Sequence, residues 1–201
     1  MTESDRSRIR KYYTDLVGKY GDDPRACDYG REKSQATKFE ILSGPIQSGH
    51  SILDVGCGYA AFADYLKSEG FDVSYTGIDI CPEMIEQARL RNPELDLHVS
   101  DPFEIAGKWD VVTANGIFYL LKESPWASMQ NLIKRMFHLS EQVCIFNSLS
   151  TWSPRSYEDE YQADPNKVVE FCSSLTTNVV LDHSYMPHDF CITLRHGPQE
   201  D

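Results

Sequence analysis

Three aspartates in the first half of the chain stand at or near the ends of short apolar runs that are typical of buried strands. Asp54 comes just before a turn that contains Gly56 and Gly58, and Asp79 and Asp101 close the next two runs. Glycines between a strand and a helix allow a tight turn and let a ligand lie against bare backbone. The helix that follows adds free N–H donors. The pattern therefore predicts a ligand site at the ends of neighbouring strands.

The spacing of these acids favours a nucleoside as the ligand. Asp79 stands 23 residues after Gly56, where an acidic side chain accepts both hydroxyls of a ribose. Asp101 is placed to accept the exocyclic amine of an adenine, with Ile80 and Phe103 offering apolar faces to the ring. Purely structural roles stay open: Asp79 as a helix N-cap, Asp101 as a turn residue before proline, and Asp54 as a buried acid bonded to backbone N–H groups.

Two nucleoside ligands compete for this site. The segment from Gly56 to Ala61 fits the GxGxxA pattern of dinucleotide-binding turns. A carboxylate at Asp54, two residues before the first glycine, would repel a pyrophosphate. The same carboxylate suits a cationic ligand that carries an ammonium and a sulfonium group.

The elements that must position these residues alternate between strand and helix. Short apolar runs predict strands, and windows with helical spacing predict helices. The expected order is strand 51–55, helix 59–68, strand 73–79, helix 82–91, strand 95–99, strand 109–114, helix 124–139, strand 142–147 and helix 165–175. Alternation with short connections predicts a parallel sheet with helices on both faces.

The two ends of the chain depart from this rhythm. Strands at 178–185 and 189–195 are too close for a parallel crossover, so they predict an antiparallel hairpin and a seven-stranded sheet. Two helical windows precede the first strand. We expect residues 1–45 to form a helical lid over the open sheet ends and residues 46–201 to form the binding domain. Packing of these helices on the sheet flank is the alternative.

Composition narrows the class of function. The 201 residues include 19 Lys and Arg against 31 Asp and Glu, a formal net charge of −12, so nucleic acid is disfavoured as a partner. No apolar run approaches the ~18 residues that span a membrane, and the start has no apolar signal core. The six cysteines show no CxxC spacing. They predict reduced thiols in a cytoplasmic protein without a metal site, with a redox or zinc role as the alternative.

The sequence resembles the class I S-adenosylmethionine-dependent methyltransferases. The resemblance lies in ILDVGCGYAAF (52–62), YTGIDICPEMIEQAR (75–89), VSDPFE (99–104) and DVVTANGIFYLL (110–121). It implies a Rossmann-like three-layer α/β fold with sheet order 3-2-1-4-5-7-6, the last strand antiparallel. It also implies S-adenosyl-L-methionine as the cofactor, held at the tops of the first, second and fourth strands.

The resemblance also assigns roles by position. Asp54 orients the ammonium side of the cofactor, Asp79 holds the ribose and Asp101 contacts the adenine amine. Asn115 and Gly116 line the site near the methyl group. The full set expected at the cofactor is Asp54, Gly56, Cys57, Gly58, Asp79, Ile80, Met84, Asp101, Pro102, Phe103, Asn115 and Gly116.

Two departures from the family pattern stand out. Ala60 replaces the third glycine of the turn, and since alanine is small and favours helix we expect tighter packing with binding retained. Asn115-Gly116-Ile117-Phe118 replaces the Asn/Asp-Pro-Pro-Tyr of enzymes that methylate nucleic-acid bases or glutamine amides. The second departure agrees with the acidic charge in disfavouring nucleic acid.

Methyl transfer from a sulfonium needs mainly alignment and water exclusion, with a base only for protonated acceptors. The catalytic candidates are therefore weak: Tyr12, Tyr119 and His188. Tyr13, Tyr20, Arg31 and Tyr119 are candidates for contact with the acceptor. Core packing, solvated cations and plain turn exposure are the alternatives for these residues.

The interpretation favoured by the sequence is a methyltransferase that acts on a small molecule by in-line displacement, as a monomer or homodimer. A non-catalytic S-adenosylmethionine-binding regulatory protein is one alternative. A dinucleotide-dependent oxidoreductase is another, and Asp54 speaks against it.

Overall fold

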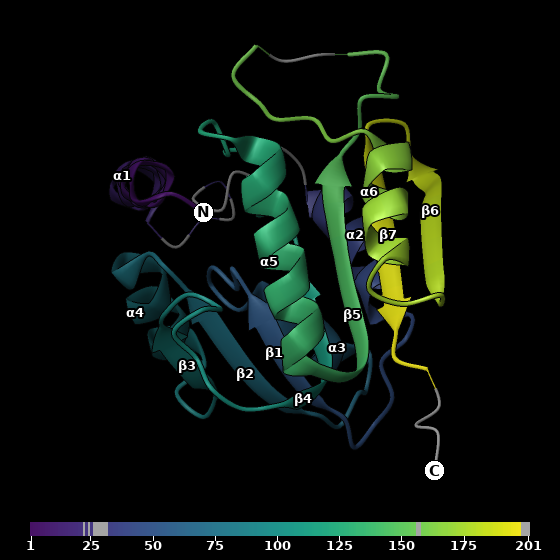
Figure 1. Ribbon diagram of the computed structural model, residues 1–201. Coiled ribbons are helices and arrows are strands. Elements are labelled where there is room, and N and C mark those ends of the chain that lie inside the picture. Colours follow the sequence, from purple (N-terminus) through teal and green to yellow (C-terminus); the bar gives the residue numbers. More distant parts are fainter. Residues whose placement is uncertain (22, 24, 26–31, 156–157, 198–201) are drawn as a thin grey trace.

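The computed structural model describes residues 1–21, 23, 25, 32–155 and 158–197, and its centre is a twisted sheet (Figure 1). The strands are β1 (Ser51–Val55), β2 (Ser74–Asp79), β3 (Asp96–Val99), β4 (Trp109–Ala114), β5 (Ser140–Leu149), β6 (Val179–Met186) and β7 (Asp189–Arg195). They form one seven-stranded sheet in the order β3-β2-β1-β4-β5-β7-β6.

Pairing within this sheet is parallel up to the last two strands. β3, β2, β1, β4 and β5 pair in parallel, whereas β7 lies antiparallel to both β5 and β6. The sheet order, the antiparallel hairpin and the α/β class predicted from the sequence are confirmed. The carboxyl ends of β1 to β5 consequently meet along one edge of the sheet, which is the edge where open α/β sheets bind ligands.

Helices cover both faces of the sheet. They are α1 (Glu3–Tyr20), α2 (Glu32–Ser43), α3 (Ala61–Ser68), α4 (Pro82–Arg91), α5 (Pro125–Leu139) and α6 (Pro165–Ser173). One apolar core joins α5 and α6 to the sheet through residues such as Leu53 and Val112. The other joins α2, α3 and α4 to it through residues such as Ile52 and Val111. Neighbouring residues of β1 and β4 thus face opposite cores, as expected for strands buried on both sides.

The N-terminal helix α1 lies across the carboxyl edge of the sheet (Figure 1). Its first turn is anchored by Asp5, which is fully buried and whose carboxylate accepts the backbone N–H groups of Lys122 and Glu123. Arg8 donates to the Leu120 carbonyl, and Arg10 Nε donates to the Ile80 carbonyl at 2.8 Å. Polar contacts therefore fix α1 to the segments that follow β2 and β4.

One element begins later than its sequence pattern predicts. The helix expected from residue 59 starts at Ala61, because Ala60 adopts a left-handed conformation with φ of 58°. Position 60, where the family pattern has its third glycine, therefore takes a positive φ here. The expectation that Ala60 serves as a helix former is wrong. A left-handed alanine costs roughly 1–2 kcal/mol, which the surrounding turn must offset.

No helix in the described part of the chain is long and apolar enough to span a membrane.

Candidate functional site: a carboxylate-lined pocket at the strand ends

The turn between β1 and α3 is held against β2 by its backbone. The N–H groups of Gly56 and Cys57 both donate to the Ile78 carbonyl, at 2.8 and 3.0 Å. Gly56 has a φ of 75°, and a Cβ on it would lie 2.6 Å from Cγ2 of Ile117. Glycine is therefore required at this position both by backbone conformation and by space.

Asp79 ties this turn to the start of α4. Its Oδ2 accepts the Gly58 N–H at 3.0 Å, and its Oδ1 accepts the Cys81 N–H at 2.8 Å. Burial raises the pKa of Asp79, and these N–H donors act in the opposite direction. The structural role left open by the sequence is real, and since each carboxylate oxygen has a second lone pair it does not exclude a ligand.

Asp54 is buried beneath the same turn and is held by a partner on β2. Tyr75 donates its hydroxyl to Asp54 Oδ2 at 2.6 Å, and both side chains are buried. The pKa of Asp54 is raised to about 7, mainly by burial; the Tyr75 hydrogen bond lowers it in part, and the nearby Asp79 adds a smaller rise. Asp54 therefore changes its charge close to neutral pH.

Asp101 follows β3 and is paired with the N-terminal helix. Arg6 Nη2 lies 2.5 Å from Asp101 Oδ2, and Asp101 Oδ1 accepts the Phe103 N–H at 2.8 Å. The second bond turns the chain so that the Phe103 ring is 47% exposed. Phe103 does not line the pocket described below, which corrects its expected place against an adenine; Pro102 and Ile80 do line it.

The segment after β4 is fixed by an amide on the neighbouring strand. Asn147 Oδ1 accepts the Gly116 N–H at 2.7 Å, and Asn147 Nδ2 donates to Asn115 Oδ1 at 2.8 Å. The structure makes Asn147 a support for Asn115 and Gly116.

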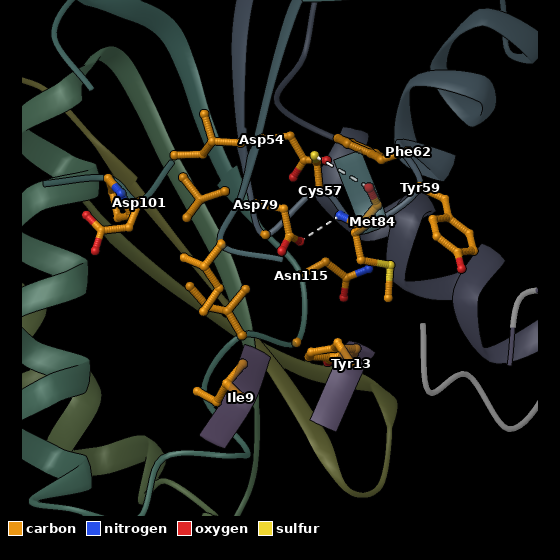
Figure 2. A pocket seen from close by; sticks show the side chains of 18 of the residues that line it. Ile9, Tyr13, Asp54, Cys57, Tyr59, Phe62, Asp79, Met84, Asp101 and Asn115 are labelled. Carbon is orange, nitrogen blue, oxygen red and sulfur yellow. Dashed lines mark hydrogen bonds between the residues drawn. The ribbon is translucent and has the colours of Figure 1, made fainter. Parts of the chain in front are cut away.

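These segments surround one pocket beneath α1, seen from close by in Figure 2. Asp54, Asp79 and Asp101 line it from three strand ends, and Ile9 and Tyr13 of α1 face them. The pocket also brings together other residues expected at the cofactor, namely Gly56, Cys57, Gly58, Ile80, Met84, Pro102, Asn115 and Gly116. Its described lining contains no lysine, arginine or histidine side chain.

The pocket lining also contains uncharged residues from α1, α2 and the segment after β4. Tyr13 and Tyr119 are two of them, and their hydroxyl oxygens are 2.9 Å apart in a hydrogen bond. Gln35 and Phe39 of α2 complete this part of the lining. It offers phenol and amide groups on an otherwise apolar wall.

Other candidates from the sequence lie away from the pocket lining. Tyr12 is 36% exposed and packs edge-on against Tyr13. Tyr20 packs beside a small cluster that contains Tyr59 and Met84. His188 stands in the turn between β6 and β7, where its carbonyl accepts the Ser150 N–H. The structure therefore gives these three side chains no direct place in the site.

Arg31 lies outside the described residues, as do Tyr29, Gly30 and the side chain of Lys33.

Sequence reasoning missed several groups that matter to the site. Tyr75 pairs with Asp54 because Gly77 is opposite Asp54 in the parallel register, so residue 75 faces the same side two positions earlier. That register, once assumed, is a signal that could have found it. Gln35 and Phe39 line the pocket, and Arg6 pairs with Asp101, from helices whose docking no sequence pattern specified.

The donor set fits an adenosine ligand with a positively charged sulfur. The lining contains three carboxylates and, among its described residues, no basic side chain. This charge suits ammonium and sulfonium groups and disfavours phosphates. Glycine backbone and apolar walls complete the setting that a nucleoside requires. Among the described residues, no group of three His, Cys, Asp or Glu is arranged to hold a metal ion.

Comparison with known proteins gives consistent matches. The family model "Methyltransferase domain" matches residues 20–176. A putative methyltransferase from Mycobacterium tuberculosis is 34% identical over 153 residues, which cover 72% of this chain and 92% of that protein. The 18S rRNA (guanine-N(7))-methyltransferase of Bos taurus is 35% identical over 69 residues, covering 34% of this chain and 24% of that protein.

A solved structure extends the likeness to nearly the whole chain. Magnesium protoporphyrin IX methyltransferase from Synechocystis, with bound SAM, superposes with a TM-score of 0.70 at 14% identity. The match covers 96% of this chain and 97% of that one. At this identity the likeness concerns the fold.

Proposed function

The chain belongs to the class I S-adenosylmethionine-dependent methyltransferases, and from this premise we propose that it methylates a small-molecule acceptor in the pocket beneath α1. The observation that carries the proposal is the pocket itself. It combines three carboxylates, a glycine turn and a wall of tyrosines under a helix that covers the open strand ends.

Each acid has a task in this proposal. Asp79 accepts hydrogen bonds from the ribose hydroxyls, Asp101 accepts from the adenine amine, and Asp54 faces the ammonium group. Gly56 and Gly58 let the amino-acid portion lie against the backbone. The support is their common place in the pocket lining and the absence of basic side chains from the described part of that lining.

The bound cofactor supplies a methyl group on a positively charged sulfur. The chain supplies alignment, since attack has to come in line with the breaking bond. Ile9 and Tyr13 on α1 close the pocket on the side opposite the strand ends and exclude water from it. The hydroxyl groups of Tyr13 and Tyr119 orient the nucleophile of the acceptor, and their oxygens accept a hydrogen bond from its N–H or O–H group.

The acceptor that this pocket suits is small and lacks negative charge. Tyr13, Gln35, Phe39 and Tyr119 give its wall phenol, amide and apolar surface. The overall charge of −12 opposes a nucleic-acid acceptor. The matched proteins include some named for small-molecule substrates and some named for ribosomal RNA. The proposal of a small-molecule acceptor therefore rests on the pocket lining and the net charge.

The test begins with calorimetry. Purified protein should bind S-adenosylhomocysteine and not NAD, and Asp79→Asn should weaken that binding about tenfold or more, because one charge-assisted hydrogen-bond partner is lost. Binding of NAD alone would overturn the proposal in favour of a dinucleotide enzyme.

A second step separates an enzyme from a regulatory binder. The protein is incubated with methyl-labelled S-adenosylmethionine and a pool of small metabolites, and label transfer is followed by mass spectrometry. Tyr119→Phe should reduce transfer without changing cofactor affinity. Cofactor binding with no transfer to any acceptor would favour the non-catalytic alternative.

A further inference from the structure

Arg6 occupies the acid that the proposed cofactor needs. Its Nη2 lies 2.5 Å from Oδ2 of Asp101, and Asp101 Oδ1 accepts the Phe103 N–H, so both carboxylate oxygens already have partners. Asp101 is only 2% exposed and lines the pocket, whereas Arg6 comes from α1. Each oxygen keeps a second lone pair, but the charge of Asp101 is already compensated by a guanidinium, with which a donating ligand has to share this carboxylate.

Arg6 has two further acidic neighbours besides Asp101. Nη1 lies 3.2 Å from the carboxylate of Glu104, and Nε lies 3.5 Å from that of Glu3. Both acids are mostly exposed, and Nε itself is buried without a hydrogen-bond partner among the described residues. The guanidinium thus has two acidic neighbours toward the solvent and an unsatisfied donor in its present place.

We propose that Arg6 is a specificity-determining residue that competes with the purine of the cofactor for Asp101. This inference rests on the proposed function, in which Asp101 accepts from the adenine amine. When a 6-amino purine binds, Arg6 yields Asp101 to the amine and pairs with Glu3 and Glu104. A 6-oxo purine has no amine to donate, so Arg6 keeps Asp101 when it binds, and wild type discriminates weakly between the two.

A neighbouring arginine provides a matched control. Arg10 also fixes α1 to the pocket rim, but it donates to the backbone carbonyl of Ile80 and to no carboxylate of the pocket. Arg10→Met therefore loosens α1 without freeing an acid. Arg6→Met loosens α1 and also frees Asp101. A comparison of the two variants separates competition for Asp101 from a general opening of the lid.

The experiment measures dissociation constants by calorimetry for S-adenosylhomocysteine and its 6-oxo analogue, S-inosylhomocysteine. Arg6→Met should bind the adenosyl ligand about tenfold more tightly than wild type, as expected when one charge-assisted competitor is removed. Its preference for adenosyl over inosyl should rise by a similar factor. Arg10→Met should show neither gain.

Other results would overturn the inference. Unchanged or weaker adenosyl binding by Arg6→Met contradicts it, and so does an equal gain in Arg10→Met. A second pair, Asp101→Asn with and without Arg6→Met, leaves no unpaired buried carboxylate. In this background Arg6→Met should change the affinity for S-adenosylhomocysteine only as much as Arg10→Met does in wild type, and a tenfold gain would contradict the inference. Failure of wild type to bind that ligand at all would instead overturn the proposed cofactor.

Discussion

Asp54 shows how burial and a single hydroxyl set the charge of a site residue. Its pKa of about 7 exceeds the ordinary 3.8 because the side chain is removed from water beside Asp79, while Tyr75 partly stabilises the anion. Between about pH 4 and pH 7 the folded protein holds a proton that the unfolded chain has lost. The contribution of Asp54 to the free energy of unfolding therefore falls across that window as pH rises.

The same shift predicts a pH-dependent affinity. A ligand with an ammonium group favours the ionised Asp54, so S-adenosylhomocysteine should bind about tenfold more tightly at pH 8 than at pH 6, given a pKa of about 7. Calorimetry at pH 6.5 in buffers of different ionisation enthalpy should show net proton release. Asp54→Asn should abolish most of both effects. Affinity that stays constant between pH 6 and pH 8 in wild type would contradict this assignment.

At the scale of elements, the β1–α3 turn depends on positive φ values in a confined space. Gly56→Ala combines a φ of 75° with a Cβ placed 2.6 Å from Ile117, so it should lower stability by about 1–3 kcal/mol and abolish cofactor binding. Gly70 also has a positive φ of 82°, with nothing within 4 Å of an added Cβ.

Gly70→Ala is thus the control for strain alone. It should cost about 1 kcal/mol in urea unfolding and leave binding of S-adenosylhomocysteine unchanged. If Gly56→Ala retained wild-type affinity, the close approach of ligand to this backbone would be refuted.

A buried ion pair joins α2 to the hairpin. Lys38 Nζ lies 2.8 Å from Oδ2 of Asp189, a residue 1% exposed that also accepts the Tyr185 hydroxyl. Removing one partner of such a pair strands a buried charge. Lys38→Met should therefore lower the free energy of unfolding by about 3 kcal/mol.

The matched control is an ion pair whose two side chains are exposed to solvent. Lys67 and Glu94 lie 3.5 Å apart with side chains 79% and 57% exposed. Lys67→Met should leave the unfolding midpoint in urea close to that of wild type, since such pairs contribute little. Equal effects of the two substitutions would show that the Lys38–Asp189 pair does not anchor α2.

At the scale of the whole molecule, the thiols report on the packing of both cores. Cys57, Cys81, Cys144, Cys172 and Cys191 are reduced and buried. Burial raises the pKa of Cys81 to about 11 and that of Cys172 to about 12, and it raises the pKa of Cys144 well above its usual value. The reactive thiolate is therefore scarce at neutral pH.

Labelling by a disulfide reagent should accordingly require opening of the fold. Peptide mapping at pH 8 should show slow modification of Cys144 and Cys172 in native protein and rapid modification in urea. Cys57 lines the pocket, so S-adenosylhomocysteine should slow its labelling directly. Cys172 lies on α6, so the ligand should slow its labelling only by raising the free energy of unfolding of the whole fold. Rapid native labelling of Cys144 would contradict the closely packed core.

The sequence by itself determined the order of elements, the glycine turn and the three acids at the strand ends. These features follow from short-range patterns: apolar runs, turn residues and the period of strands and helices. The hairpin followed from its short connection. The resemblance, also read from the sequence, supplied the order of strands in the sheet.

Only the tertiary structure decided what surrounds those acids. The Arg6–Asp101 and Tyr75–Asp54 pairs, the α2 wall and the outward Phe103 depend on how separate elements dock. Such contacts join residues far apart in the chain and leave no periodic trace in it, because docking is settled by packing and by the need to satisfy buried polar groups. The left-handed Ala60 is a similar case, since the turn overrides its helix propensity.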